Sequence, residues 1–199
     1  MDWTGSKESI FVTHGASNHS SEKRADLDYY ATDPIAIDKL LQREKFNHYI
    51  LEPACGGGHI SDALFKNGYD VLSLDVVDRG YPNQSCVQDF LKNNYDHKNR
   101  RDIITNPPYA RAKEFVEHAL DISEKHVKIA MFLKLTFLEG GKRKALFDKY
   151  PPKSIYVFRN RIDCWKNGIK PEKPSRAVCY AWFIWEKGCA ESPQIFWID

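Results

Sequence analysis

The chain has 199 residues, of which 42% are hydrophobic and 28% are charged, and its formal net charge is +2. This length suffices for one well-buried core and is short for two, so we expect a single compact domain. No run approaches the roughly 20 consecutive apolar residues that span a bilayer, and the first residues are polar rather than apolar like a signal segment. These features argue against a membrane protein and favour a cytoplasmic one.

Cysteine and histidine spacing points to neither disulfides nor metal. No C-x-x-C pair occurs, and the seven histidines show no ligand spacing, so we expect reduced thiols and no metal site. The charge is uneven, because Lys and Arg outnumber Asp and Glu over residues 100–187 while the reverse holds elsewhere. A polyanion bound to the second half and a solvated mixed surface both explain this excess.

The predicted elements begin after a polar arm. Residues 1–26 are rich in Ser, His, Asn and Lys without a sustained period, which predicts a mobile arm followed by one domain over residues 27–199. Asp33 suits a helix N-cap and Pro34 the first helical position, so a helix is expected from there to about Lys45.

Strands and helices alternate through the rest of the chain. The first unit is a short apolar strand, a glycine turn and a helix closed by Asn67-Gly68. Further strands are predicted over residues 70–76, 101–105, 126–133, 154–158 and 177–185, and helices over 112–123 and 141–150. This order predicts an α/β fold with a mainly parallel three-layer sheet and an antiparallel strand near its end.

The segment Glu52–Gly58 (EPACGGG) follows the first strand, where ligands bind in open α/β sheets. Its glycines let the backbone approach a ligand closely. The Lys-Ser/Thr of a P-loop and the Gly-x-Gly-x-x-Gly spacing are both missing, which disfavours a nucleoside triphosphate. A sulfonium nucleoside such as S-adenosylmethionine instead needs amide groups and a carboxylate, and Glu52 supplies the carboxylate.

Two further acids follow extended segments. Asp75 ends the next strand, where its oxygens could accept hydrogen bonds from a ribose diol. Asp89 and Phe90 could bracket an adenine ring, the carboxylate accepting from the exocyclic amine and the ring covering the face. Each acid alone is more often a solvated strand end or a cap; three at successive strand ends favour a nucleoside site.

The most specific pattern is Asn106-Pro107-Pro108-Tyr109, placed directly after an apolar strand. The Asn106 side-chain carbonyl and the Pro107 backbone carbonyl can accept from the two N–H groups of an aromatic amine and so free its lone pair for attack on a sulfonium methyl. Paired prolines stiffen the loop, and Tyr109 offers a face on which a base can stack. A plain turn is the alternative interpretation.

Taken in order, Tyr30–Pro34, Glu52–Gly58, Asp75, Asp89–Phe90 and Asn106–Tyr109 resemble the successive motifs of amino-directed DNA methyltransferases, specifically small phage-type or orphan adenine-N6 enzymes. The resemblance implies a seven-stranded Rossmann-like class I methyltransferase fold, S-adenosylmethionine as cofactor and DNA as partner. It implies cofactor contacts from Tyr30, Ala31, Thr32, Pro34, Glu52, Pro53, Ala54, Cys55, Gly56, Gly58, Asp75, Val76, Asp89, Phe90 and Asn106.

The sequence departs from this family in two ways. The first loop of the family is more usually Asp-Pro-x-Cys-Gly-x-Gly, whereas Glu52 and three consecutive glycines stand here. Because only 90 residues follow Tyr109, we expect no separate target-recognition domain there. Specificity is therefore expected to be weak, or to come from short loops, a homodimer or a separate partner.

Two basic loops are candidates for nucleic-acid contact, residues 134–144 and 160–176, because both combine positive charge with aromatic or glycine residues. A core position for Trp165 is the alternative. The predicted substrate-binding residues are Lys134, Lys142, Arg143, Arg161, Trp165, Lys166 and Arg176.

Three hypotheses about the function stay open at this point. Adenine in DNA comes first, and the same motif also serves RNA adenine or a protein glutamine amide. A non-catalytic nucleic-acid-binding or anti-restriction protein on the same fold is the third.

Overall fold

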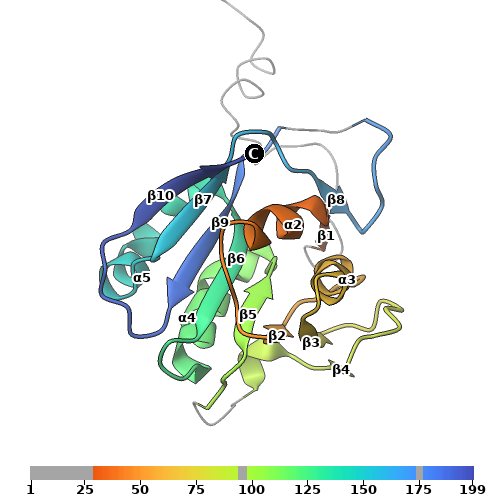
Figure 1. Ribbon diagram of the computed structural model, residues 1–199, viewed down its shortest axis with the longest axis horizontal. Coiled ribbons are helices and arrows are strands. Elements are labelled where there is room, and N and C mark those ends of the chain that lie inside the picture. The colour runs from red at the N-terminus through yellow and green to blue at the C-terminus, as the bar shows by residue number, and fades with distance from the viewer. Residues whose placement is uncertain (1–28, 94–97, 174–176) are drawn as a thin grey trace, which may run out of the picture.

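The computed structural model describes residues 29–93, 98–173 and 177–199 (Figure 1). Its strands are β1 (Tyr30–Thr32), β2 (Tyr49–Glu52), β3 (Asp70–Asp75), β4 (Cys86–Val87), β5 (Asp102–Thr105), β6 (Lys128–Lys134), β7 (Ser154–Phe158), β8 (Cys164–Lys166), β9 (Tyr180–Glu186) and β10 (Gln194–Ile198). Its helices are α2 (Ile35–Leu41), α3 (His59–Lys66), α4 (Ala112–Ile122) and α5 (Lys144–Lys149), with 3-10 turns η2 (Phe90–Lys92), η3 (Tyr109–Arg111), η4 (Leu135–Leu138) and η5 (Gly141–Arg143).

Eight of the described strands form one sheet in the order β10-β7-β9-β6-β5-β2-β3-β4. The run from β4 to β6 is parallel throughout, and β9 lies antiparallel to both β6 and β7. The predicted parallel sheet with an antiparallel strand near the C-terminus is thus confirmed. An eighth strand, β10, extends the sheet beside β7 and was not predicted.

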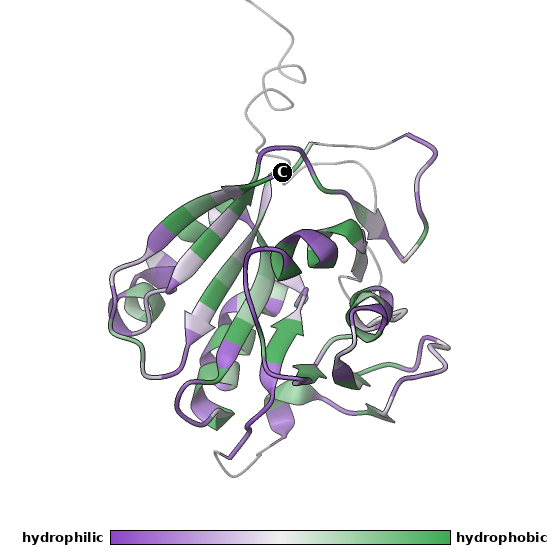
Figure 2. Ribbon diagram, viewed as in Figure 1, coloured by the Kyte–Doolittle hydropathy of each residue, from purple (hydrophilic) through white to green (hydrophobic). Residues whose placement is uncertain are grey.

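The sheet lies between two helical layers. Along β6, Ile129, Met131 and Leu133 pack in the cluster that contains α4 and α5, whereas Ala130 and Phe132 pack in the cluster that contains α2 and α3. This alternation is the period-two pattern of a strand buried on both faces. Figure 2 shows hydrophobic residues along β5 and β6 and polar residues on the outer turns of the helices. The structure therefore has the predicted three layers.

The turn between β2 and α3 explains the glycine run. Gly58 precedes α3 with φ 82°, and Gly68 follows it with φ 85°, a region that glycine enters without steric cost. A Cβ on Gly58 would lie 2.1 Å from the Tyr81 ring, whereas one on Gly68 would meet nothing within 4 Å. Gly58 is thus required for close packing and Gly68 for the backbone turn alone.

Short elements differ from the sequence-based prediction. β1 and β8 form a separate antiparallel pair that joins the start of the domain to the loop 160–173. Helix α2 begins at Ile35, one residue later than predicted, and ends at Leu41, before the predicted end near Lys45. The Asp33 carboxylate accepts from the Ile35 N–H at 3.1 Å. The predicted arm 1–26 and Arg176 lie outside the described residues.

None of the helices in the described ranges has the length and apolar character needed to cross a membrane. Within the same ranges, no three His, Cys, Asp or Glu side chains gather in a way that could hold a metal ion.

Candidate functional site

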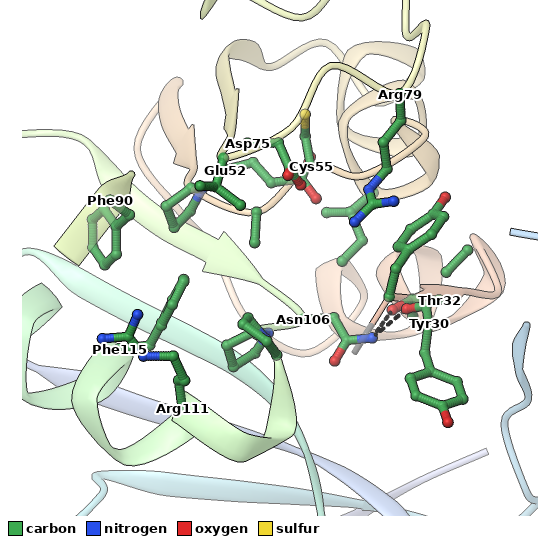
Figure 3. A pocket seen from close by; sticks show the side chains of 18 of the residues that line it. Tyr30, Thr32, Glu52, Cys55, Asp75, Arg79, Phe90, Asn106, Arg111 and Phe115 are labelled. Atoms are coloured by element: carbon green, nitrogen blue, oxygen red, sulfur yellow. Dashed lines mark hydrogen bonds between the residues drawn. The ribbon is translucent and has the colours of Figure 1, made fainter. Parts of the chain in front are cut away.

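A cavity of about 530 Å³ opens where β2, β3 and β5 end (Figure 3). Parallel strands in an open sheet deliver their C-terminal residues to one edge, so residues distant in sequence meet there. The cavity is lined by Tyr29, Tyr30, Ala31, Thr32, Glu52, Pro53, Ala54, Cys55, His59, Ile60, Asp75, Val76, Arg79, Asp89, Phe90, Asn106, Pro107, Pro108, Ala110, Arg111 and Phe115.

Most residues of the predicted cofactor set line this cavity. Three do not: Pro34 stands at the start of α2, and Gly56 and Gly58 shape the turn behind the wall. The structure therefore brings together the segments that the resemblance singled out.

Asn106 lies directly beyond β5, and its side-chain nitrogen is hydrogen-bonded whereas its side-chain oxygen is not. Its Nδ2 donates to the Tyr30 carbonyl at 2.9 Å and to the Thr32 hydroxyl at 3.0 Å. A backbone carbonyl can only accept, so these bonds assign the nitrogen and leave the amide oxygen on the other side. That oxygen is buried and has no partner among the described residues, and Figure 3 shows it turned away from Tyr30 and Thr32. Asn106 thus presents an unpaired acceptor at the cavity wall.

Tyr109 lies between two cavities. Its neighbours Pro108 and Ala110 line the first, and Tyr109 itself lines a second cavity of about 470 Å³. Its ring stacks with Tyr30 at 5.8 Å and with Tyr180 at 6.1 Å.

Polar contacts also hold the Tyr109 side chain. The hydroxyl lies 3.4 Å from Cys164 Sγ, and Lys134 Nζ lies 5.0 Å from the ring centre. Burial raises the pKa of Tyr109, so the phenol stays neutral. Tyr109 is thus a packed, uncharged ring with the Lys134 ammonium group beside it.

Asp75 ties the glycine turn to the end of β3. One carboxylate oxygen accepts from the Gly56 N–H at 2.8 Å and the other from the Val77 N–H at 3.0 Å. Each oxygen has a second lone pair, so the carboxylate can still accept from a diol.

Glu52 is 1% exposed, and the Ser61 hydroxyl donates to its Oε2. Ser61 in turn shares a hydrogen bond with Ser73 at 2.6 Å. Burial raises the pKa of Glu52 to about 8, because removal from water penalises the carboxylate more than this hydrogen bond stabilises it. Near pH 7 the carboxyl group is therefore mostly protonated, whereas a cationic ligand would favour its ionised form.

Asp89 and Phe90 lie at the far end of the cavity. One Asp89 oxygen caps η2 by accepting from the Leu91 N–H at 3.1 Å. Phe90 is 1% exposed and packs against Phe115 at 5.1 Å and His118 at 4.8 Å. Phe90 and Phe115 therefore give this end an apolar wall beside a carboxylate.

The predicted substrate residues divide between two places. Lys134 and Arg143 line the second cavity with Tyr109, and the exposed Lys142 does not. The Arg143 guanidinium donates to the backbone carbonyls of Phe137 at 2.7 Å and Thr136 at 3.2 Å, so it also holds the loop 134–144 closed.

The other predicted substrate residues lie in and beside β8. Trp165 and Lys166 belong to this strand, and Trp165 is half-buried with its edge against His59 at 5.3 Å. Arg161 is exposed and donates to the Ala177 carbonyl at 3.5 Å. Trp165 thus packs on the cofactor-side wall, not beside Tyr109.

Sequence reasoning missed several residues that line the cavity, namely Tyr29, His59, Ile60, Arg79, Ala110, Arg111 and Phe115. His59 and Ile60 could have been found, because they follow the glycine turn directly. Arg79 and Arg111 follow no motif spacing, and only the fold brings them to the cavity.

No family model and no curated protein matches the chain. Solved structures do. A candidate class I S-adenosylmethionine-dependent methyltransferase from Listeria monocytogenes is 14% identical, with a TM-score of 0.54 over 95% of this chain and 71% of that one.

Two further structures concern nucleic-acid enzymes. A modification subunit of a candidate type I restriction enzyme from Vibrio vulnificus is 12% identical, with a TM-score of 0.55 over 96% of this chain and 50% of that one. A candidate RNA methyltransferase from Pyrococcus horikoshii is 12% identical, with a TM-score of 0.56 over 92% and 98%. At such identities the likeness is one of architecture, and by it this chain has the Rossmann-like fold of class I methyltransferases.

Proposed function

We propose that the protein is an S-adenosylmethionine-dependent N-methyltransferase whose preferred acceptor is the N6 amine of adenine in DNA. The observation that carries the proposal is Asn106, because its amide oxygen is buried without a donor while its nitrogen is fixed by Tyr30 and Thr32. A buried unpaired acceptor costs free energy, on the order of 1–3 kcal/mol, and a ligand N–H would remove that cost.

The cavity fits the cofactor in size and chemistry. Its volume of about 530 Å³ falls in the usual range for a nucleoside-sized ligand. An apolar end with Asp89 suits adenine, Asp75 suits a ribose diol, and Glu52 suits a cationic amine. The sequence alone assigned Asp89 and Asp75 to these roles, and it assigned Glu52 as the carboxylate that such a nucleoside needs.

When bound, S-adenosylmethionine supplies an electrophilic methyl group on a sulfonium sulfur. The acceptor nitrogen uses its lone pair to form the new N–C bond as the S–C bond breaks and its electron pair returns to sulfur. The alkylated nitrogen then releases a proton to solvent. Asn106 and the Pro107 carbonyl accept from the two N–H bonds and draw the nitrogen towards tetrahedral geometry, in a loop already stiffened by two prolines.

The second cavity supports a base as the bearer of the amine. Tyr109 forms its wall next to the Asn106 loop, and Lys134 covers that ring at 5.0 Å. A flipped base could stack on the ring by displacing the flexible lysine, whose charge would then pair with a phosphate. The similarity to a modification subunit of a restriction enzyme agrees with DNA as the acceptor polymer. Because a candidate RNA methyltransferase is equally similar, RNA is also tested as an acceptor.

The experiment is incubation with labelled S-adenosylmethionine and, separately, duplex DNA, single-stranded DNA, RNA and protein. We expect label in DNA and N6-methyladenine in its digest by mass spectrometry. Asn106→Ala should reduce the rate by about 100-fold or more, as loss of an oriented polar group in a catalytic site does. The exposed Gln194→Ala, on the edge strand β10, is the control and should keep full activity.

The distribution of label separates the alternatives. Label in RNA or in glutamine side chains would keep the transfer chemistry and replace the acceptor. If no polymer is labelled but DNA still binds, the protein is a non-catalytic nucleic-acid-binding protein on this fold.

A further inference from the structure

Two arginines line the cofactor cavity from opposite ends. Figure 3 shows Arg111 beside Phe115 at the apolar end and Arg79 extending from the loop after β3 towards the end with Tyr30 and Thr32. An arginine in a cavity that holds a sulfonium ligand requires an explanation, because the two positive charges repel each other in a partly buried site.

Arg79 is fixed in place without a counter-ion. Its guanidinium lies 4.3 Å from the centre of the Tyr29 ring, a cation–π contact. Its Nε is buried and has no hydrogen-bond partner among the described residues. No ion pair joins it to an acid in the described parts of the chain. The charge therefore remains available to a ligand.

Tyr29, which supports Arg79, is itself held firmly. Its hydroxyl accepts from the Gly57 N–H at 2.9 Å, and its carbonyl accepts from the Asn167 N–H at 3.1 Å. Added Cβ atoms on Gly56 and Gly168 would lie 2.3 Å and 2.8 Å from Tyr29 atoms, so these glycines leave room for the ring. The glycine turn and the end of β8 thus build a platform for the guanidinium.

The order of groups along the ligand determines what reaches Arg79. With adenine at Phe90 and the ribose at Asp75, the sulfonium comes opposite Asn106. The amino-acid tail then continues away from Phe90, towards Thr32 and Arg79. The tail carries a carboxylate, the partner that a planar guanidinium binds best.

We propose that Arg79, held on Tyr29, binds the α-carboxylate of S-adenosylmethionine; this rests on the proposed function. The carboxylate comes between the guanidinium and the sulfonium, which removes the repulsion and pairs the orphan Nε. Arg79 is thus a binding residue that discriminates for the carboxylate, whereas Arg111 at the opposite end does not.

The test compares S-adenosylmethionine with its decarboxylated analogue by calorimetry, for the wild type, Arg79→Gln and Arg111→Gln. The wild type should bind S-adenosylmethionine roughly 10- to 100-fold more tightly than the analogue, the range of a charge-assisted hydrogen bond in a partly buried site. Arg79→Gln should lose that ratio, weakening S-adenosylmethionine while leaving the analogue unchanged or more tightly bound. Arg111→Gln should leave the ratio of the two affinities unchanged, even if it changes both affinities by a common factor.

Other outcomes overturn the inference. Equal weakening of both ligands in Arg79→Gln would mean that Arg79 only supports the cavity wall, and unchanged affinities for both ligands would mean that the carboxylate binds elsewhere. Circular dichroism and thermal unfolding identify a variant that fails to fold, and Arg79→Lys, which keeps the charge, should then retain part of the ratio. A wild type that binds neither nucleoside overturns the proposed function itself.

Discussion

The Asn106 Nδ2 group is oriented by two hydrogen bonds to oxygen and by a longer contact with Cys164 Sγ at 4.0 Å, so removing one oxygen atom can weaken its orientation. Thr32 is 2% exposed and supplies the hydroxyl that accepts one of them. In Thr32→Val the amide keeps the Tyr30 carbonyl and the longer contact with Cys164 Sγ, and the alternative orientation, with an N–H towards the acceptor amine, gains population. Under the proposed function we expect about a 10-fold lower single-turnover rate at saturating S-adenosylmethionine, the effect of roughly one hydrogen bond.

The conservative variant separates orientation from packing. Thr32→Ser keeps the hydroxyl and loses only a methyl group, so its rate should return close to that of the wild type. A Thr32→Val enzyme as fast as the wild type would show that the Tyr30 carbonyl and Cys164 Sγ suffice to orient the amide.

At the residue scale, contacts between segments far apart in the chain were the hardest to predict. The Asn-Pro-Pro-Tyr spacing predicts an acceptor role for Asn106, which stays a prediction, and the structure shows that its amide oxygen has no partner among the described residues. The spacing did not predict that Tyr30 and Tyr180 would already pack against the Tyr109 ring, since those contacts join segments far apart in the chain. Arg79 was missed for the same reason.

At the scale of a single element, the two ends of helix α3 can be compared, because each is flanked by a glycine with positive φ. Gly58 and Gly68 bracket it with nearly equal positive φ, but only Gly58 faces a neighbouring ring, that of Tyr81. Gly68→Ala should cost about 1 kcal/mol of unfolding free energy, from backbone strain alone. Gly58→Ala should cost more, because Tyr81 must also move from its 2.7 Å hydrogen bond to Asp62.

Urea unfolding of the two variants measures this difference, and calorimetry adds a second reading. Gly58→Ala should also weaken the binding of S-adenosylhomocysteine, since it displaces the turn that carries the cavity wall, whereas Gly68→Ala should not. Equal stability losses with equal binding would mean that Tyr81 relaxes freely.

Long elements were predictable because their burial pattern repeats along the strand, and short ones were not. β7 was predicted with its observed bounds. β1 and β8 have three residues each, too few for any period, and pair only with each other. In β10, Ile195 and Trp197 are exposed, so this edge strand lacks the buried run that made the central strands recognisable.

At the scale of the whole molecule, the site costs stability that depends on pH. Glu52 is fully buried with a pKa raised to about 8 from 4.5 by desolvation. Between these values the unfolded chain is ionised while the folded protein retains the proton. The folded state therefore binds more protons, and the Glu52 contribution to stability, present below pH 4.5, is lost as the pH rises through 8. The slope from this one group is at most about 1.4 kcal/mol per pH unit.

Glu52→Gln removes the titration and keeps an oxygen that can accept from Ser61. We expect urea unfolding at pH 5.5 and pH 8 to show that the free energy of unfolding of the variant increases, relative to that of the wild type, as the pH rises. The exposed Glu191→Gln should leave the pH dependence of the wild type unchanged. Parallel pH profiles for Glu52→Gln and the wild type would contradict the raised pKa. Because a bound cation favours the ionised carboxylate, S-adenosylmethionine should flatten the wild-type profile and leave that of Glu52→Gln as it is, which links the buried acid to its proposed ligand.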